Sequence, residues 1–167
     1  YLDGREIKTP PQYFLGAAAS PFASNMKFQA LREQKKVNAG AQFFQTNVVF
    51  EADDLDLWLS ELAKRSVLEK VYILIGISPL KSYRMAKFMN DKVPGIFVPE
   101  RVMQRMEAAE QKGNAEEEGV QITLELIEKL RNKPGVNGFH IMAVGWEEIV
   151  PRIIEEAGLA KPLKVKE

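Results

Sequence analysis

The sequence predicts an α/β fold built on a parallel sheet, and two observations support this prediction. Four short apolar segments alternate along the chain with segments whose apolar residues recur at helical spacing. The segment 71–77 (Val-Tyr-Ile-Leu-Ile-Gly-Ile) is apolar almost throughout, which is typical of a strand covered on both faces. Strands that alternate with helices in this way favour parallel pairing.

Turn and capping residues bound each expected element. The expected strands are 13–19, 42–50, 71–77 and 138–144. The expected helices are 26–39, a segment from Asp53 or Asp54 through Leu62, 79–90, 99–112, 120–130 and 146–157. Ser24 or Asn25 can cap the first of these helices, and Gly40 can end it.

Two parallel architectures fit this alternation of strands and helices. A doubly wound dinucleotide-binding sheet lacks its fingerprint here, because no Gly-x-Gly-x-x-Gly follows any expected strand and no phosphate-loop lysine motif occurs. A (β/α)8 barrel needs about 250 residues. The chain has 167 residues, so its four units would make half of such a barrel.

The composition excludes several classes of protein. The 23 Lys and Arg residues balance 23 Asp and Glu residues, and this zero net charge argues against nucleic-acid binding and against a polybasic membrane-surface protein. No apolar run approaches the roughly 20 residues that span a bilayer. The absence of cysteine excludes thiolate metal sites, and the single histidine, His140, excludes a multi-histidine site. We expect a cytoplasmic protein and, because the chain opens with Tyr1, a piece of a longer one.

Two amides stand near the end of the second expected strand. Gln45 and Asn47 flank Thr46 and are two residues apart, so simple alternation places them on one face. They can point toward a ligand, or they can be satisfied by neighbouring backbone groups. Glu51 is the carboxylate close to a strand end, and we favour a cap or surface role for it.

A polar stripe lies along the first expected helix. Gln29, Arg32, Lys35 and Lys36 recur at helical spacing. Such a stripe can be a solvated helix face, or it can bind a ligand that carries phosphate. His140 lies early in the fourth strand, where a hydrogen-bonded core histidine is the more usual occupant than a general base.

Four segments, in this order and at these spacings, carry a resemblance to a known family. The segment 14–22 reads Phe-Leu-Gly-Ala-Ala-Ala-Ser-Pro-Phe, and the segment 35–47 reads Lys-Lys-Val-Asn-Ala-Gly-Ala-Gln-Phe-Phe-Gln-Thr-Asn. The segments 76–80 (Gly-Ile-Ser-Pro-Leu) and 138–142 (Gly-Phe-His-Ile-Met) follow. From about Phe14 to Leu159 the chain resembles the C-terminal half of the methylenetetrahydrofolate reductases.

This resemblance implies a (β/α)8 or TIM barrel, of which the chain supplies the last four β/α units. The expected layout is a lead-in segment 1–12, a half-barrel domain 13–160 and a tail 161–167. The resemblance also implies FAD at the carboxyl ends of the strands. The implied reaction is hydride transfer from reduced flavin to 5,10-methylenetetrahydrofolate, which gives 5-methyltetrahydrofolate, with NADH or NADPH as a possible electron donor.

The resemblance assigns a role to each matching position. The positions that it places against the cofactor are Ser20, Pro21, Gln29, Arg32, Lys35 and Lys36. Asn47 matches a glutamine that contacts folate and Tyr83 matches an aromatic residue of the substrate site; with Gln45 they form the expected substrate-binding set. The acidic residues of the family's chemistry belong to its first half, so we expect no catalytic residue and no activity in this chain alone.

The chain departs from the better-studied members at three positions. Asn47 is one methylene shorter than the usual glutamine, and Met142 and Trp146 replace a tyrosine and an arginine. The segment 140–148 (His-Ile-Met-Ala-Val-Gly-Trp-Glu-Glu) resembles the versions found in anaerobic one-carbon metabolism, some of which take electrons through a partner subunit. The alternative function is a catalytically silent subunit that binds folate or flavin and docks on an electron-transfer or methyl-transfer partner.

A half-barrel also predicts unpaired surfaces. The strands that begin at Tyr13 and Gly138 should be sheet edges. The inner face should expose the apolar side chains Val48, Phe50, Ile73 and Ile75. We therefore expect the chain to occur beside its missing N-terminal half or as a homo-oligomer.

Overall fold

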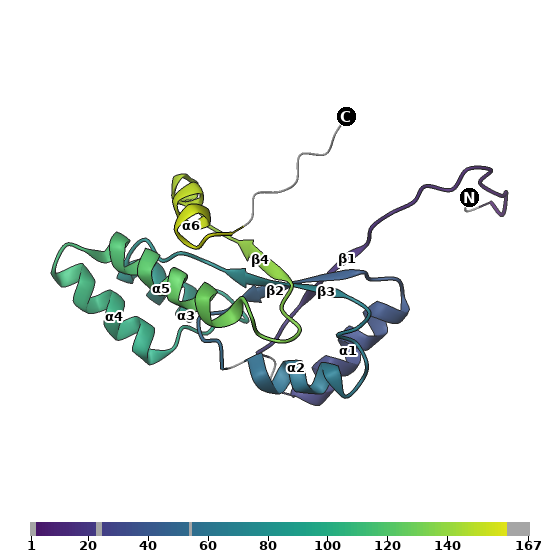
Figure 1. The fold of residues 1–167 in the computed structure, drawn as a ribbon, viewed down its shortest axis with the longest axis horizontal. Helices are drawn as coiled ribbons and strands as arrows, with labels where there is room; N and C mark the ends of the chain where they lie inside the picture. The colour runs from purple at the N-terminus through teal and green to yellow at the C-terminus, as the bar shows by residue number, and fades with distance from the viewer. Residues whose placement is uncertain (1–2, 23–24, 54, 160–167) are drawn as a thin grey trace.

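The four strands form one parallel sheet in the order β1-β2-β3-β4 (Figure 1). A computed structural model describes residues 3–22, 25–53 and 55–159 of the chain. The strands are β1 (Gly16–Ala19), β2 (Phe43–Val48), β3 (Tyr72–Ile77) and β4 (Gly138–Ile141). This confirms the α/β class with a parallel sheet, and β1 and β4 are its two edges, as predicted.

Six α-helices are found in the described part of the chain, and each follows a strand or another helix. They are α1 (Met26–Asn38), α2 (Leu55–Ala63), α3 (Tyr83–Lys92), α4 (Glu100–Gln111), α5 (Ala115–Leu130) and α6 (Val150–Glu156). The Asn25 side chain caps α1 by accepting the Phe28 N–H at 3.0 Å. The other cap candidates, Ser24 and Asp54, lie outside the described residues.

Several boundary predictions were wrong, among them those after β3 and at the end of β4. The helix expected to start at Pro79 begins at Tyr83, because the Ser82 hydroxyl accepts the Met85 N–H at 3.1 Å and caps α3 there. The strand expected to reach residue 144 stops at Ile141, and a 3-10 turn at Glu147–Ile149 leads into α6.

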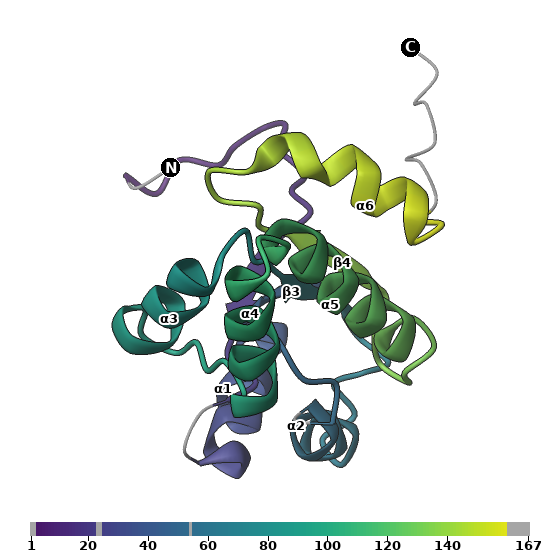
Figure 2. The same cartoon turned by 90° about the vertical axis from the view of Figure 1, so that its left-hand side faces the viewer.

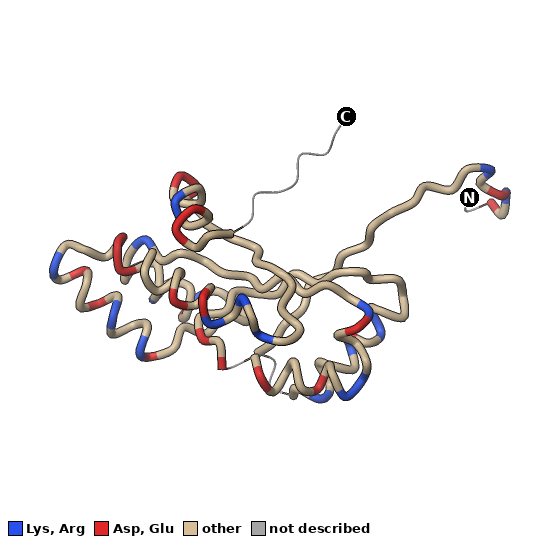
Figure 3. The backbone as a smooth tube through the Cα atoms, in the orientation of Figure 1, with Lys and Arg blue, Asp and Glu red and all other residues tan. Residues whose placement is uncertain are grey.

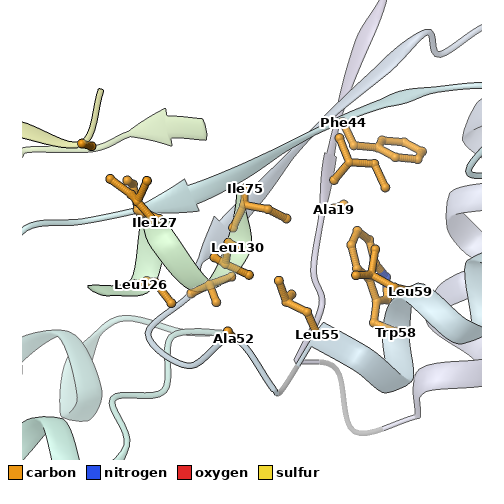
Figure 4. Close-up of a cluster of buried hydrophobic side chains, with 14 of the residues drawn as sticks. Ala19, Phe44, Ala52, Leu55, Trp58, Leu59, Ile75, Leu126, Ile127 and Leu130 are labelled. Carbon is orange, nitrogen blue, oxygen red and sulfur yellow. The ribbon is translucent and has the colours of Figure 1, made fainter. Parts of the chain in front are cut away.

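One face of the sheet is buried under helices. Phe44 and Ile75 are fully buried against residues of the helix layer such as Trp58 of α2 and Ile127 of α5 (Figure 4). Ile73 is fully buried in the same cluster. In the views of Figures 1 and 2, α1 pairs with α2 and α4 pairs with α5 on this side of the strands. The prediction that Ile73 and Ile75 line an exposed inner face was therefore wrong, because their faces point into the helix layer.

A second apolar cluster closes the carboxyl end of β2. Val48 and Phe50 are 3% and 4% exposed, where the prediction had them on an open surface. They pack with Met89 of α3, Met106 of α4 and Ile122 of α5. The three helices between β3 and β4 thus bury the side chains that the sequence analysis assigned to the open face.

The other face of the sheet is open. Tyr72 is 60% exposed, Gln45 is exposed, and Leu74 and His140 are half-buried. The strand expected to be covered on both faces is therefore covered on one face only. The N-terminal residues 3–15 form no helix or strand and run away from β1 (Figure 1).

Candidate functional site

The carboxyl ends of the four parallel strands meet at one edge of the sheet, which is where sites form in parallel α/β proteins. Ser20 is half-buried and Pro21 is buried directly after β1. After β3, the Ser78 hydroxyl donates to the Met142 carbonyl at 2.8 Å and so ties the ends of β3 and β4 together.

A β-bulge interrupts β2 at this edge. Gln45 pairs with Leu74 and Val48 pairs with Gly76, so three steps along β2 match two along β3. Thr46, inside the bulge, is buried and its hydroxyl accepts the Gly76 N–H at 2.8 Å. The bulge lies between Gln45 and Val48, so simple alternation alone does not relate Gln45 to Asn47, and that they share a face stays a prediction.

Asn47 lies against the loop that joins α3 to α4. A Cβ placed on Gly95 would come within 3.1 Å of the Asn47 Nδ2. Tyr83, the first residue of α3, is half-buried against the second apolar cluster, and its backbone N–H donates to Glu110 at 3.1 Å. Gln45 is exposed, two residues nearer the start of β2.

The four residues of the predicted polar stripe do not share one environment. Gln29 is 4% exposed and its Nε2 donates to Glu33 at 2.6 Å, while Glu33 also accepts from the indole N–H of Trp58 at 3.4 Å. Gln29 therefore belongs to the α1–α2 interface and not to a ligand-facing stripe. Arg32 and Lys35 are exposed.

Three basic residues of α1, namely Arg32, Lys35 and Lys36, keep their charge available to a ligand. The Lys36 ammonium donates to the Ala18 carbonyl of β1 at 2.5 Å, which leaves two of its three donors free of that bond. Among the ion pairs of the described residues, none includes Arg32, Lys35 or Lys36. Figure 3 shows basic residues along α1.

Glu51 is held by two cations of the helix layer. Arg101 of α4 donates to it at 2.5 Å and Lys129 of α5 lies 3.7 Å away. These contacts account for Glu51 as a structural ion-pair residue, in line with the surface role that we favoured.

His140 differs from the expected hydrogen-bonded core histidine. It pairs with Gly76 in the register of β3 and β4, which places it on the same face as Tyr72 and Leu74. Its Nδ1 is buried and has no hydrogen-bond partner among the described residues.

The sequence analysis assigned no role at this edge to Thr46 or Gly76. A Cβ on Gly76 would lie 2.5 Å from the Thr46 carbonyl oxygen, 2.9 Å from that of Asn47 and 2.6 Å from Met142 Cε. A lone glycine in an apolar strand indicates a bulge or a close backbone approach, and that signal was available at Gly76.

Comparison with known families and structures identifies the chain's relatives. The family model described as methylenetetrahydrofolate reductase matches residues 17–158. The chain belongs to the methylenetetrahydrofolate reductase family. The match covers all four strands and all six helices given above except the first residue of β1, so the resemblance drawn from the sequence is confirmed.

A solved structure shares the fold of this family member. It is an uncharacterized protein from Clostridium thermocellum, described as binding two copies of 5-methyl-5,6,7,8-tetrahydrofolic acid, and it aligns with a TM-score of 0.63 at 20% sequence identity. The alignment covers 88% of this chain and 54% of that one, so this chain spans about half the length of that relative. A comparison with curated proteins gave no match. No described helix is long and apolar enough to cross a membrane.

Proposed function

We propose that this chain forms part of the folate and flavin site of an oxidoreductase that reduces 5,10-methylenetetrahydrofolate to 5-methyltetrahydrofolate. The observation that carries the proposal is the polar carboxyl edge of an open parallel sheet in a chain of this family. The solved relative, which binds 5-methyltetrahydrofolate, supports the same ligand class. The expected location is the cytoplasm.

FAD fits the cations of α1 only in part. Arg32, Lys35 and Lys36 have no carboxylate partner among the described residues and would hold its phosphates. Ser20 and Pro21 would border it at the end of β1. Gln29 does not fit, because its amide is buried and bonded to Glu33. When bound, FAD supplies the hydride, with NADH, NADPH or a redox partner subunit as the source of electrons.

Folate would lie against β2 and α3. Asn47 and Gln45 each offer an amide that can donate and accept, which suits the donor and acceptor edge of a pterin ring. Tyr83 would supply a planar ring for stacking. These residues bind and orient the substrate, while the acid that assists the reaction would come from outside this chain.

A second half-barrel would cover the open face. The sheet has free edges at β1 and β4, and the solved relative is about twice as long as the aligned part of this chain. The covering half is either the N-terminal half of the same barrel or a second copy of the chain. The four strands described above would then be the last four of a (β/α)8 barrel.

Ligand titration tests the proposal in two arms. Asn47→Ala should weaken binding of 5-methyltetrahydrofolate and leave FAD binding unchanged. Replacing both Arg32 and Lys35 with Ala should cost about 2 to 4 kcal/mol of FAD affinity, at about 1 to 2 per charge-assisted contact, and leave folate binding unchanged. Fluorescence titration of the chain, alone and with a covering half, measures both.

The pattern across these two arms decides between functions. Binding of folate or FAD without turnover, even with the covering half present, would favour the catalytically silent subunit. If the chain binds neither ligand in either state, the proposal is wrong.

A further inference from the structure

The bulge in β2 is held by one side chain. Thr46 is 3% exposed, and its hydroxyl makes two hydrogen bonds of 2.8 Å: it accepts from the Gly76 N–H and donates to the Asn47 carbonyl. A hydroxyl has one donor and two acceptor positions, so both bonds form at once. Thr46 thus links the neighbouring strand to the backbone of Asn47.

The neighbouring strand leaves the bulge little freedom. The Gly76 carbonyl accepts the Val49 N–H at 2.8 Å, so both backbone polar groups of Gly76 bond to the segment that contains the bulge. The carbonyl oxygens of Thr46 and Asn47 also approach Gly76 so closely that a Cβ there would lie within 2.9 Å of each. Removal of the Thr46 hydroxyl would leave the buried Gly76 N–H without its partner.

The bulge also decides where the Asn47 amide lies. Beyond the bulge, Val48 returns to the ladder opposite Gly76, and Asn47 Nδ2 lies against Gly95 in the loop between α3 and α4. Bulges commonly re-aim a side chain at a functional site. Asn47 has its backbone fixed on one side by Thr46 and its amide bounded on the other side by Gly95.

We infer that Thr46 is a positioning residue for folate binding: its hydroxyl holds the β-bulge that sets the Asn47 amide at the carboxyl end of β2. This inference rests on the proposed function for the role of Asn47, whereas the role of Thr46 in the bulge rests on the hydrogen bonds alone. Thr46 does not contact the ligand in this scheme, so its effect passes entirely through Asn47.

Thr46→Val is the test variant, because it keeps the shape of the side chain and removes the hydroxyl. Thr123→Val is the matched control: Thr123 is also 3% exposed and its hydroxyl also donates to a backbone carbonyl at 2.8 Å, that of Gly119 within α5. Thr46→Ser restores the hydroxyl. Two readouts are needed, namely hydrogen exchange of the Gly76 amide and the Kd for 5-methyltetrahydrofolate measured by calorimetry.

The expected pattern separates positioning from general stability. Thr46→Val should speed exchange at Gly76 and raise the Kd on the order of tenfold, the equivalent of one hydrogen bond. Thr46→Ser should restore both values, and Thr123→Val should change neither. In the Asn47→Ala background, Thr46→Val should cause no further rise in the Kd, because the two residues act as one unit.

Each contrary result has a distinct meaning. If Thr46→Val speeds exchange at Gly76 and leaves the Kd unchanged, the positioning role is wrong and the proposed function stands. If Asn47→Ala itself leaves the Kd unchanged, the substrate site of the proposed function is wrong, and this inference with it. Thr46→Ala, which also lacks the hydroxyl and adds no methyl group in its place, gives the same test should Thr46→Val fail to fold.

Discussion

The two faces of the sheet are built from the same strands and differ in what covers them. Ile75 is fully buried under the helix layer, while its neighbours Leu74 and Tyr72 on the opposite face are half-buried and 60% exposed. All three side chains are largely apolar, so composition does not distinguish the faces. The helix-covered face accounts for folding, whereas the open face is available for contacts with a ligand or a second half-barrel.

The largest expected difference compares adjacent residues of β3. Ile75→Ala should lower the free energy of unfolding by about 2 to 5 kcal/mol, because it removes fully buried methyl groups and leaves a cavity. Leu74→Ala, on the open face, should cost less than Ile75→Ala, since the Leu74 side chain is only partly removed from water. Urea unfolding followed by circular dichroism measures both.

Equal losses for the two variants would contradict the assignment of faces. The assignment would stand only if the open face were covered in solution by a tightly bound partner that unfolds together with the chain. Repeating the measurement at several protein concentrations separates this case, because unfolding coupled to dissociation depends on concentration.

The next comparison concerns two glycines on the open side of the sheet. Gly76→Ala should cost about 1 to 3 kcal/mol of stability, because the new Cβ would overlap two backbone carbonyls that cannot move independently. Gly138→Ala is the matched control. Its Cβ would meet only Leu74 Cδ2, at 3.1 Å, and a side-chain end can turn away. Thermal unfolding of the two variants tests this, and equal melting temperatures would show that the bulge backbone yields to the methyl group.

The sequence predicted the elements well and the faces poorly, and β3 shows why. The run 71–77 was identified as a strand by its apolar residues, but both sets of alternate residues in it are apolar, so nothing in it marks a side. The pairing of Gln45 with Leu74 is what assigns the open face, and strand register is not readable from one strand alone. Val48 and Phe50 are buried like Phe44, at alternate positions of the same segment, and pack in the second cluster.

The candidate site was predictable in part for similar reasons. Lys35 and Arg32 are exposed on α1, where charged side chains are usual. Gln29 satisfies the same helical spacing, yet it is buried because Glu33 and Trp58 form a polar contact inside the α1–α2 interface. Only the packing of one helix on another distinguishes such an internal partner from a ligand.

The third prediction tests what the open face does when the fold is intact. If a second half-barrel covers this face, the chain should associate with a second copy at micromolar concentration, because an extended apolar surface is seldom left exposed in a monomer. Tyr72→Lys should weaken this association by placing a charge in the contact, and Tyr72→Phe should preserve it. Neither change should alter unfolding by more than about 1 kcal/mol, since Tyr72 is 60% exposed.

Sedimentation velocity of the three proteins over a range of concentrations measures the association. A wild-type chain that remains a monomer, alone and with the N-terminal half of a family member, would contradict coverage of the open face by a half-barrel.

The smallest expected effect comes from the charges on the outer surface of the helix layer. Arg105 of α4 donates to both carboxylate oxygens of Glu125 on α5, at 2.6 and 2.9 Å, and this hydrogen bonding lowers the pKa of Glu125 from its ordinary value of 4.5. A carboxyl group whose pKa is lowered by folding contributes stability that is complete above pH 4.5 and is lost as the pH falls through the folded-state pKa.

Arg105→Gln should therefore reduce the free energy of unfolding that is lost between neutral pH and about pH 3. The reduction should be no more than about 1 kcal/mol, because Glu125 is 48% exposed and solvent screens the pair. Arg84→Gln on α3 is the control, since Arg84 takes part in no ion pair among the described residues. Urea unfolding at the two pH values measures the difference. A change as large as that of Ile75→Ala would mean that charge contributes as much as burial to the helix-covered side. A change within the expected limit would leave burial by the helix layer as the cause of the difference between the two faces.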